Sequence, residues 1–280
     1  MAEPKYAFKV LEDSKYKDTW KDSLTQRIND PSKIHQQGSP LCGPAAFMYC
    51  IARTAPETYR KYVQDLAYHG EAMLGSLHVK PRPECLNETA DNLVKIGIDP
   101  VDWIALASLR DSSNDFLSVT AGSSLAGITL PSTLADWFNQ SGLFSGGVSK
   151  QASTSSTEHG LDSLIEANCR HRSGSCVCLF LRAAIIGGGG SLGINKLGGK
   201  DTPKTWSGAP DHWVVLVSDI HLGRQQNLIP FSCSLPRTDG LEDEPLRARI
   251  YTWGRERPMS AGRVGNFLPY YYGFVGAARH

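Results

Sequence analysis

The chain has 280 residues, of which 41% are hydrophobic and 20% are charged, and its formal net charge at pH 7 is +1. This length and apolar content allow a sizeable core, in one elaborated domain or in two lobes. A net charge close to zero argues against binding to nucleic acid or to an anionic membrane, and no run reaches the roughly 18 apolar residues of a membrane span.

The first strong motif runs from Gln36 to Ala46 and reads QQGSPLCGPAA. It places Cys42 at a glycine-flanked turn before an apolar run, and it predicts a helix from Cys42 to about Arg53. In the first turn of a helix, unpaired N–H groups and the positive end of the dipole favour the thiolate form of a cysteine. Cys42 is therefore a candidate nucleophile, provided that a histidine lies beside it.

Helical patterns dominate the next part of the chain. The second predicted helix begins at Pro56 and ends at Gly70, a residue type that favours helix ends. Further helices are predicted over 89–96, 132–140 and 161–167.

Two segments are predicted to be mobile because they are rich in small residues. Ser141 to Glu158 holds many Ser, Gly and Thr residues, and Ile186 to Gly199 is rich in glycine. The plainer interpretation of the second segment is a hairpin connection, and the alternative is a loop that gates a cleft.

The seven cysteines are an odd number, and the simplest prediction is a reducing compartment in which all of them are free. Cys50 is predicted to be a small buried hydrophobe. The cluster from Cys169 to Cys178 lacks a Cys-x-x-Cys knuckle, which favours a buried strand over a zinc site. We therefore expect neither a metal nor a cofactor.

Strands dominate the last hundred residues, and they are predicted over 177–186, 212–220, 247–253 and 267–275. The second of them begins at His212, in the segment DHWVVLVSD, which makes this histidine the best partner for Cys42. The third ends in Trp253 and Gly254, where an indole could cover the imidazole. Most of the remaining histidines lack a partner pattern. His35 is adjacent to Gln36 and could approach the site, but helix-entry geometry does not require this, and a surface role is predicted for it.

The order of the elements, helices first and strands later, predicts an α+β chain. The helix-rich lobe is predicted over about residues 1–170 and the sheet-rich lobe over about 171–280.

Three separate segments resemble the papain-like cysteine peptidases, and among them the bacterial branch of double-glycine, bacteriocin-processing peptidases. Gln36 stands six residues before Cys42, where the family carries the glutamine of its oxyanion hole. The segment CGPAA is similar to the bacterial nucleophile turn, HWVV to the general-base strand, and YTWG to the family's Asn-Ser-Trp-Gly. The resemblance implies one papain-like catalytic domain over residues 1–280, with a nucleophile helix in a helical lobe packed against an antiparallel sheet lobe.

The chain departs from this family at Tyr251, which stands where the family carries the asparagine or aspartate that orients the histidine. Strand alternation places Tyr251 and Trp253 on one face, so the phenol could take this role. Asp219 and a backbone carbonyl are the alternatives.

The resemblance implies that the protein hydrolyses peptide bonds through a thioester. Cys42 attacks as a thiolate paired with the His212 imidazolium, Gln36 and the Cys42 N–H stabilise the oxyanion, and Trp253 shields the histidine. The implied substrate is a protein or peptide, with glycines next to the cleaved bond.

The first residues lack the apolar core of a signal peptide, which predicts synthesis in the cytosol and, for export, a route independent of classical signals. This feature and the bacterial character of the nucleophile turn raise the hypothesis of an exported effector or toxin. Such a toxin would have a cognate inhibitor, or immunity, protein.

Other functions use the same residues. A papain-like peptidoglycan amidase would cut cell-wall cross-links, and a deamidase or acyltransferase would form the same thioester from a glutamine side chain. A non-catalytic binding module would keep the cleft and leave Cys42 inert. The motifs do not separate these alternatives.

Overall fold

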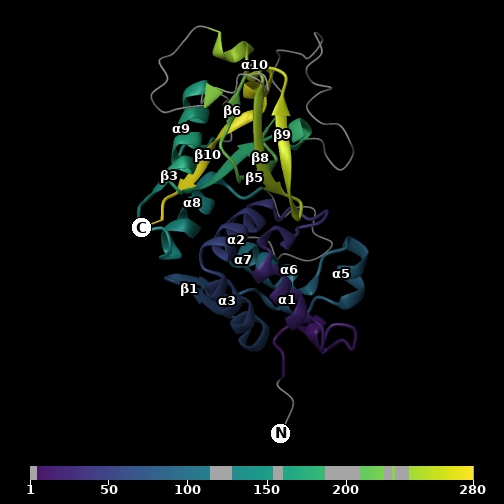
Figure 1. Cartoon of the computed structure of the whole chain (residues 1–280). Coiled ribbons are helices and arrows are strands. Elements are labelled where there is room, and N and C mark those ends of the chain that lie inside the picture. The colour runs from purple at the N-terminus through teal and green to yellow at the C-terminus, as the bar shows by residue number, and fades with distance from the viewer. Residues whose placement is uncertain are drawn as a thin grey trace. The chain divides into compact units, whose positions relative to one another are not determined.

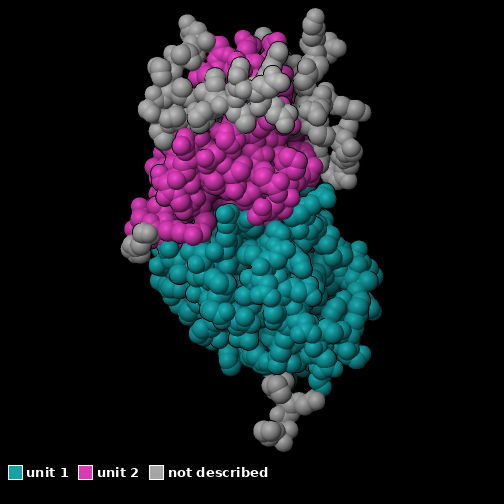
Figure 2. Space-filling model, in the orientation of Figure 1, with its two compact units in different colours: residues 1–129, 136–143, 252–255 teal, residues 130–135, 144–251, 256–280 magenta. Residues whose placement is uncertain are grey.

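The computed structural model describes residues 5–113, 128–153, 160–186, 209–223, 229–230 and 240–279. The chain forms two compact units, which Figure 2 draws in different colours. One unit holds residues 1–129, 136–143 and 252–255, and the other holds 130–135, 144–251 and 256–280. Helices predominate in the first unit and an antiparallel sheet in the second, so the predicted α+β class is confirmed.

The first unit consists mainly of short helices (Figure 1). Its elements in chain order are η1 (Lys9–Glu12), α1 (Trp20–Asn29), η2 (Pro31–Lys33), α2 (Cys42–Thr54), α3 (Pro56–His69), β1 (Ala72–Leu74), β2 (Leu77–Val79), α4 (Pro83–Leu86), α5 (Ala90–Ile96), α6 (Pro100–Asp102), the π-helix η3 (Trp103–Ala107) and α7 (Ser108–Ser112). The residues of α8 (Pro131–Gln140) divide between the two units. Among the described residues, no helix has both the length and the apolar character that a membrane span requires.

Helix α2 is buried over most of its length. Every residue from Cys42 to Ala52 is buried, because small or apolar side chains occupy all of its faces. The Phe47 ring packs edge-on against Phe138, with centroids 5.1 Å apart. Gly43 has no room for a side chain, since a Cβ atom there would overlap the Thr129 side chain. The start of α2 is therefore held by close packing.

The structure confirms the predicted helices α2, α3, α5 and α8, whose end signals the chain carries locally. Pro56 is the first residue of α3, and Gly70 ends this helix with a φ of +74°. The helix predicted over 161–167 is longer in the structure, where α9 spans Gly160–Arg172. Neither α1 nor the helices from α6 to α7 were predicted from the sequence.

In the second unit, the described strands form one eight-stranded sheet with the order β3-β10-β4-β5-β8-β6-β7, and β9 pairs with β8. The strands are β3 (Val148–Lys150), β4 (Cys176–Leu181), β5 (His212–Leu216), β6 (His221–Leu222), β7 (Ile229–Pro230), β8 (Leu246–Thr252), β9 (Arg255–Ala261) and β10 (Tyr271–Ala277). The pairs along this order are antiparallel.

Helix α9 packs against β10 and β4 (Figure 1). The hydroxyl groups of Ser163 and Tyr271 lie 3.1 Å apart, and the Asn168 side chain accepts the Ile220 N–H at 2.7 Å. Because α9 covers the sheet and β3 pairs with β10, both elements belong to the second unit. This unit therefore begins before residue 171, where the sheet-rich lobe was predicted to start.

Three predicted strands end or begin differently in the structure. The strand predicted over 212–220 ends at Leu216. The strand predicted over 177–186 ends at Leu181, and the short helix η4 (Ala183–Ile186) follows it because the Asp211 carboxylate accepts the Ala183 N–H at 2.6 Å. The strand predicted over 267–275 begins only at Tyr271, since α10 (Val264–Phe267) and η7 (Leu268–Tyr270) precede it.

The two segments predicted to be mobile have different outcomes. β3 lies inside the first, at 148–150, where pairing with β10 satisfies its backbone, so the prediction was wrong there. Most of the second segment falls in residues 187–208, outside the described residues.

The cysteines are not all free. Among the described residues the cysteines that form no disulfide are Cys42, Cys50, Cys85, Cys176 and Cys178, and all of them are buried. Cys169 is disulfide-bonded, so the prediction of a fully reduced chain was wrong at this position. Disulfides persist mainly in oxidising compartments, and a local sequence pattern does not reveal which cysteines pair.

We expect iodoacetamide to label five thiols in the denatured, unreduced protein and all seven after reduction with dithiothreitol, as counted by intact mass. The control is Cys169→Ser, which should take up the same number of labels before and after reduction. Seven labels without a reductant would contradict the disulfide.

Candidate functional site

The residues that the sequence analysis singled out fall in both units. Those in the first unit are Gln36, Cys42 and Trp253. Those in the second unit are His212, Tyr251 and Asp219.

Cys42 is the first residue of α2 and is only 4% exposed. The first-turn N–H groups of a helix have no partner within the helix, so this position favours negative charge. Arg110 in α7 adds a second source of positive potential, because this buried guanidinium interacts electrostatically with Cys42. Burial lowers the pKa of Arg110, and negative charge on Cys42 opposes that shift. Arg110 was not predicted from the sequence, since no spacing rule connects it to Cys42.

Gln36 lies buried in the turn that precedes α2. Its Nε2 donates to the Ser39 carbonyl at 3.1 Å, and the Ser39 N–H donates to the Gln36 carbonyl at 3.2 Å. A primary amide carries two N–H donors, so one remains after the bond to Ser39. The side chain therefore keeps the capacity to donate to an oxyanion, which is the role predicted for it from the sequence.

Trp253 and Gly254 form the two-residue turn between β8 and β9. Both have positive φ angles, +48° and +70°, which is the backbone signature of a type I′ hairpin turn. A Cβ atom at Gly254 would overlap the His35 ring, and the Trp253 backbone hydrogen-bonds this ring. The predicted surface role of His35 was therefore wrong: its ring is partly buried against this turn.

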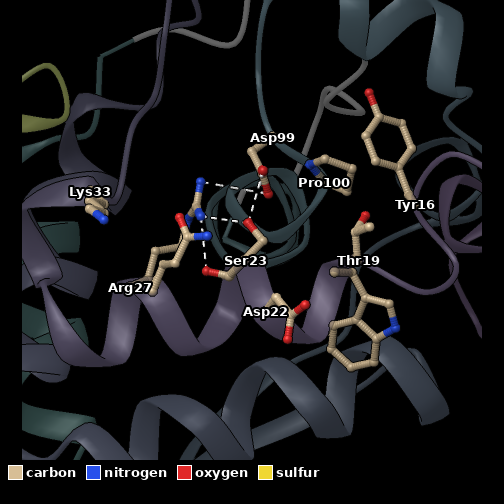
Figure 3. Close-up of a pocket in the computed structure, with 10 residues that line it drawn as sticks. Tyr16, Thr19, Asp22, Ser23, Arg27, Lys33, Asp99 and Pro100 are labelled. Atoms are coloured by element: carbon tan, nitrogen blue, oxygen red, sulfur yellow. Dashed lines mark hydrogen bonds and ion pairs between the residues drawn. The ribbon is translucent and has the colours of Figure 1, made fainter.

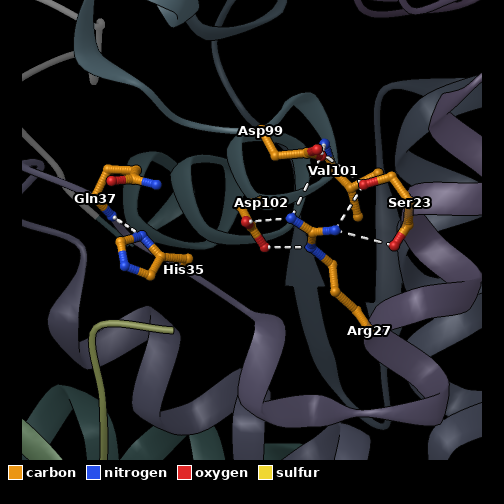
Figure 4. A network of polar contacts seen from close by, with 7 residues as sticks. All are labelled: Ser23, Arg27, His35, Gln37, Asp99, Val101 and Asp102. Atoms are coloured by element: carbon orange, nitrogen blue, oxygen red, sulfur yellow. Dashed lines mark hydrogen bonds and ion pairs between the residues drawn. The ribbon is translucent and has the colours of Figure 1, made fainter. Parts of the chain in front are cut away.

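Figure 4 shows an ion pair close to His35, formed by Arg27 and Asp102. The Arg27 guanidinium donates from Nε and Nη2 to the two carboxylate oxygens of Asp102, at 2.8 and 2.7 Å. Its Nη1 donates to the Ser23 carbonyl at 3.0 Å and to the Ser23 hydroxyl at 2.6 Å. The His35 backbone N–H donates to the Asp102 carboxylate. Every nitrogen of this guanidinium is therefore satisfied, as a stable buried pair requires.

Asp99 links the same network to the surface. It accepts the Ser23 hydroxyl at 2.9 Å and, at the start of α6, the Val101 N–H at 2.8 Å. A pocket of about 480 Å³ opens beside it, lined by Asp99, Ser23 and Arg27 together with Tyr16 and Pro100 (Figure 3). No residue of the predicted catalytic set lines this pocket, so we do not assign it to the chemistry of Cys42.

His212 begins β5 and stands opposite Leu181 of β4. It is only 3% exposed, and burial lowers its pKa to about 3. The imidazole is therefore neutral at pH 7 and can accept a proton. Next to it, Trp213 turns to the other sheet face and stacks on Phe180, with ring centroids 4.2 Å apart.

The register of β5 and β8 argues against Tyr251 as the residue that orients His212. Tyr251 stands opposite Val215, so these two side chains share one face of the sheet. His212 is three residues before Val215 on the same strand, and strand alternation places it on the opposite face. The next residue of β8, Thr252, is also buried.

Asp219 does not orient His212 either. Its carboxylate lies 3.1 Å from His171 Nδ1 and 3.7 Å from Arg172 Nε, at the last turn of α9. It follows the far end of β5, and the strand alone separates that end from His212 by about 13 Å at roughly 3.3 Å per residue. The role predicted for Asp219 was therefore wrong.

The described residues contain no cluster of three or more His, Cys, Asp or Glu side chains that could hold a metal ion. Comparisons with protein-family models, with curated proteins and with solved structures find no match to this chain. The class that the fold defines is α+β, with a helical unit and an antiparallel sheet unit.

Proposed function

We propose that the protein is a cysteine peptidase of papain-like fold, with Cys42 as nucleophile and His212 as general base. The observation that carries this proposal is a buried thiol at the first residue of a helix that is buried from Cys42 to Ala52, preceded by a turn that holds a buried glutamine. A structural cysteine would need neither the helix terminus nor the charge of Arg110.

The proposed reaction starts when His212 takes the proton of the Cys42 thiol, which yields a thiolate and imidazolium pair. The thiolate attacks the peptide carbonyl carbon, and the resulting oxyanion accepts hydrogen bonds from Gln36 Nε2 and the Cys42 N–H. His212 then gives its proton to the leaving amine as the C–N bond breaks, which leaves a thioester on Cys42. Water attacks the thioester, again with His212 as base, and restores the thiol.

Burial lowers the pKa of His212 and so opposes the imidazolium form. A neutral imidazole can accept the Cys42 proton, and the thiolate that results would stabilise the imidazolium beside it. The positive charge of Arg110 lowers the free energy of the thiolate at that moment. We take a backbone carbonyl as the group that orients His212, because strand alternation places the Tyr251 side chain on the other face of the sheet.

We propose a peptide substrate with glycines at the cleaved bond, and a role as an exported effector held in check by a cognate inhibitor protein. The disulfide at Cys169 supports an oxidising destination after synthesis in the cytosol.

The test is the rate at which iodoacetamide alkylates Cys42 between pH 4 and 9, measured by mass spectrometry. In the wild type we expect fast, selective alkylation that persists below the free-thiol pKa of about 8.5. His212→Ala should lose the fast alkylation at low pH, which depends on the base. Arg110→Met should shift the pH profile of the alkylation rate to higher pH. Cys50, buried in the same helix, is the internal control. Slow alkylation near pH 8.5 in all three proteins would contradict the proposal and favour a binding module.

A further inference from the structure

We propose that His35 is a positioning residue, which acts as a neutral imidazole and holds Gln36 in the geometry of an oxyanion donor. The inference rests on the proposed function. In it, His35 fixes the turn before α2 against the turn formed by Trp253 and Gly254.

The ring of His35 is bound on both of its nitrogens. The Gln37 N–H donates to Nδ1 at 2.8 Å, so Nδ1 is an acceptor and carries no proton (Figure 4). This leaves Nε2–H as the ring donor for the Trp253 backbone. Only the neutral tautomer with its proton on Nε2 satisfies both partners. The ring therefore joins the residue after Gln36 to the tip of the β8–β9 hairpin.

The two residues that contact the His35 ring both have strained backbone conformations. In the described part of the chain, the non-glycine residues with positive φ are Gln37, at +52°, and Trp253, at +48°. Such conformations raise the free energy by about 1 to 3 kcal/mol each and persist where surrounding contacts hold them, most often at functional sites. Here both strained residues hydrogen-bond His35 through their backbones. The ring therefore provides contacts that offset the strain.

The backbone of His35 is held as firmly as its ring. Its N–H donates to the fully buried Asp102 carboxylate, which Arg27 fixes from the other side. Gln36 follows directly in the chain, so a residue anchored at N–H and at both ring nitrogens limits where the Gln36 side chain can point. Because a displacement of about 1 Å can reduce catalysis 100-fold, such an anchor has a measurable effect.

The charges around the ring favour its neutral form. Burial lowers the pKa of His35, the bond to the Trp253 backbone opposes this shift, and the positive charges of Arg27 and Arg255 add to it. The Asp102 carboxylate is paired with Arg27 and faces the backbone of His35. If Nδ1 of His35 were protonated, its N–H would face the Gln37 N–H, and two donors cannot hydrogen-bond each other. The turn before α2 would then lose this contact.

The experiment compares two reactions of Cys42 that differ in their need for an oxyanion hole. Acylation by p-nitrophenyl acetate passes through an oxyanion, whereas alkylation by iodoacetamide does not. In His35→Ala, we expect acylation to slow by about 10-fold to 100-fold and alkylation to stay within about 2-fold. His35→Asn, which retains an acceptor near Nδ1, should recover part of the acylation rate.

Two results of this comparison overturn the inference, and a third overturns the proposed function. Equal losses in both reactions would indicate general damage to the site, and no loss in either would show that His35 does not position Gln36. If wild type and Cys42→Ala are acylated equally, the proposed function itself has failed. Nitrogen-15 NMR of the His35 imidazole in the wild type gives a readout that does not depend on catalysis. We expect the neutral tautomer with its proton on Nε2 at pH 7. A charged ring or the other tautomer would overturn the positioning role of His35, even if Cys42 is a nucleophile.

Discussion

The Cys42→Ala variant should lose all measurable peptide hydrolysis. Removing the nucleophile of a catalytic triad lowers kcat by about 10⁶-fold in a well-studied serine peptidase, and no other described thiol starts a helix in this chain. The fold should survive, because alanine is small and favours helices, so we expect the free energy of unfolding to change by about 1 kcal/mol or less. The measurement is hydrolysis of glycine-rich peptides, with urea unfolding in parallel.

Cys50→Ala is the matched control for this experiment. Cys50 is buried in the same helix and its loss removes a similar side chain, so the variant reports on packing without touching the predicted nucleophile. Full activity in Cys50→Ala beside none in Cys42→Ala would assign the chemistry to Cys42. Wild-type turnover in Cys42→Ala would refute the assignment.

The second large effect is on stability, at the buried pair of Arg27 and Asp102. Removing one partner of a buried ion pair leaves an uncompensated charge and destabilises a protein by about 3 to 5 kcal/mol. We expect Arg27→Met to lower the free energy of unfolding more than a substitution of Asp102 does. Arg27→Met leaves the fully buried Asp102 carboxylate without its partner, whereas Arg27 lines the pocket and Asp102 does not. The measurement is the free energy of unfolding in urea.

The pH dependence of this effect follows from the pKa of Asp102, which burial raises from 3.8 to about 6 against the opposing effect of Arg27. The folded state therefore holds this proton more tightly than the unfolded state. The stability that Asp102 contributes is full below pH 3.8 and falls as pH rises towards 6. Without Arg27 this pKa rises further, so the deficit of Arg27→Met should shrink as pH falls from about 7 to about 5.

Two controls separate charge burial from packing. The double variant Arg27→Met with Asp102→Leu replaces both partners by apolar groups and should be less destabilised than Arg27→Met alone. Lys61→Ala breaks an exposed pair with Asp65 and should change the free energy of unfolding by about 0.5 kcal/mol or less. Equal effects of Arg27→Met and Lys61→Ala would contradict the buried pair.

The predicted roles of the site residues differ in how far local patterns support them. Cys42 was predicted at the start of a helix and begins α2, because glycine, proline and an apolar run define that start locally. His212 was predicted at the start of a strand and begins β5, because β-branched residues follow it. Local patterns do not show that Tyr251 lies opposite Val215 or that Asp219 pairs with His171, since these contacts depend on strand register and on ion pairs between distant segments.

The amino-acid sequence by itself determined the α+β class, helices α2, α3, α5 and α8, and the positions of Cys42 and His212 at the start of their elements. These features depend on periodicity, turn residues and end signals, which act over a few residues. Only the tertiary structure decided the buried pair of Arg27 and Asp102 and the contacts that His35 makes with Gln37, Trp253 and Asp102. Their partners are far apart in the chain, and burial and hydrogen bonding act between residues that only the complete fold brings together.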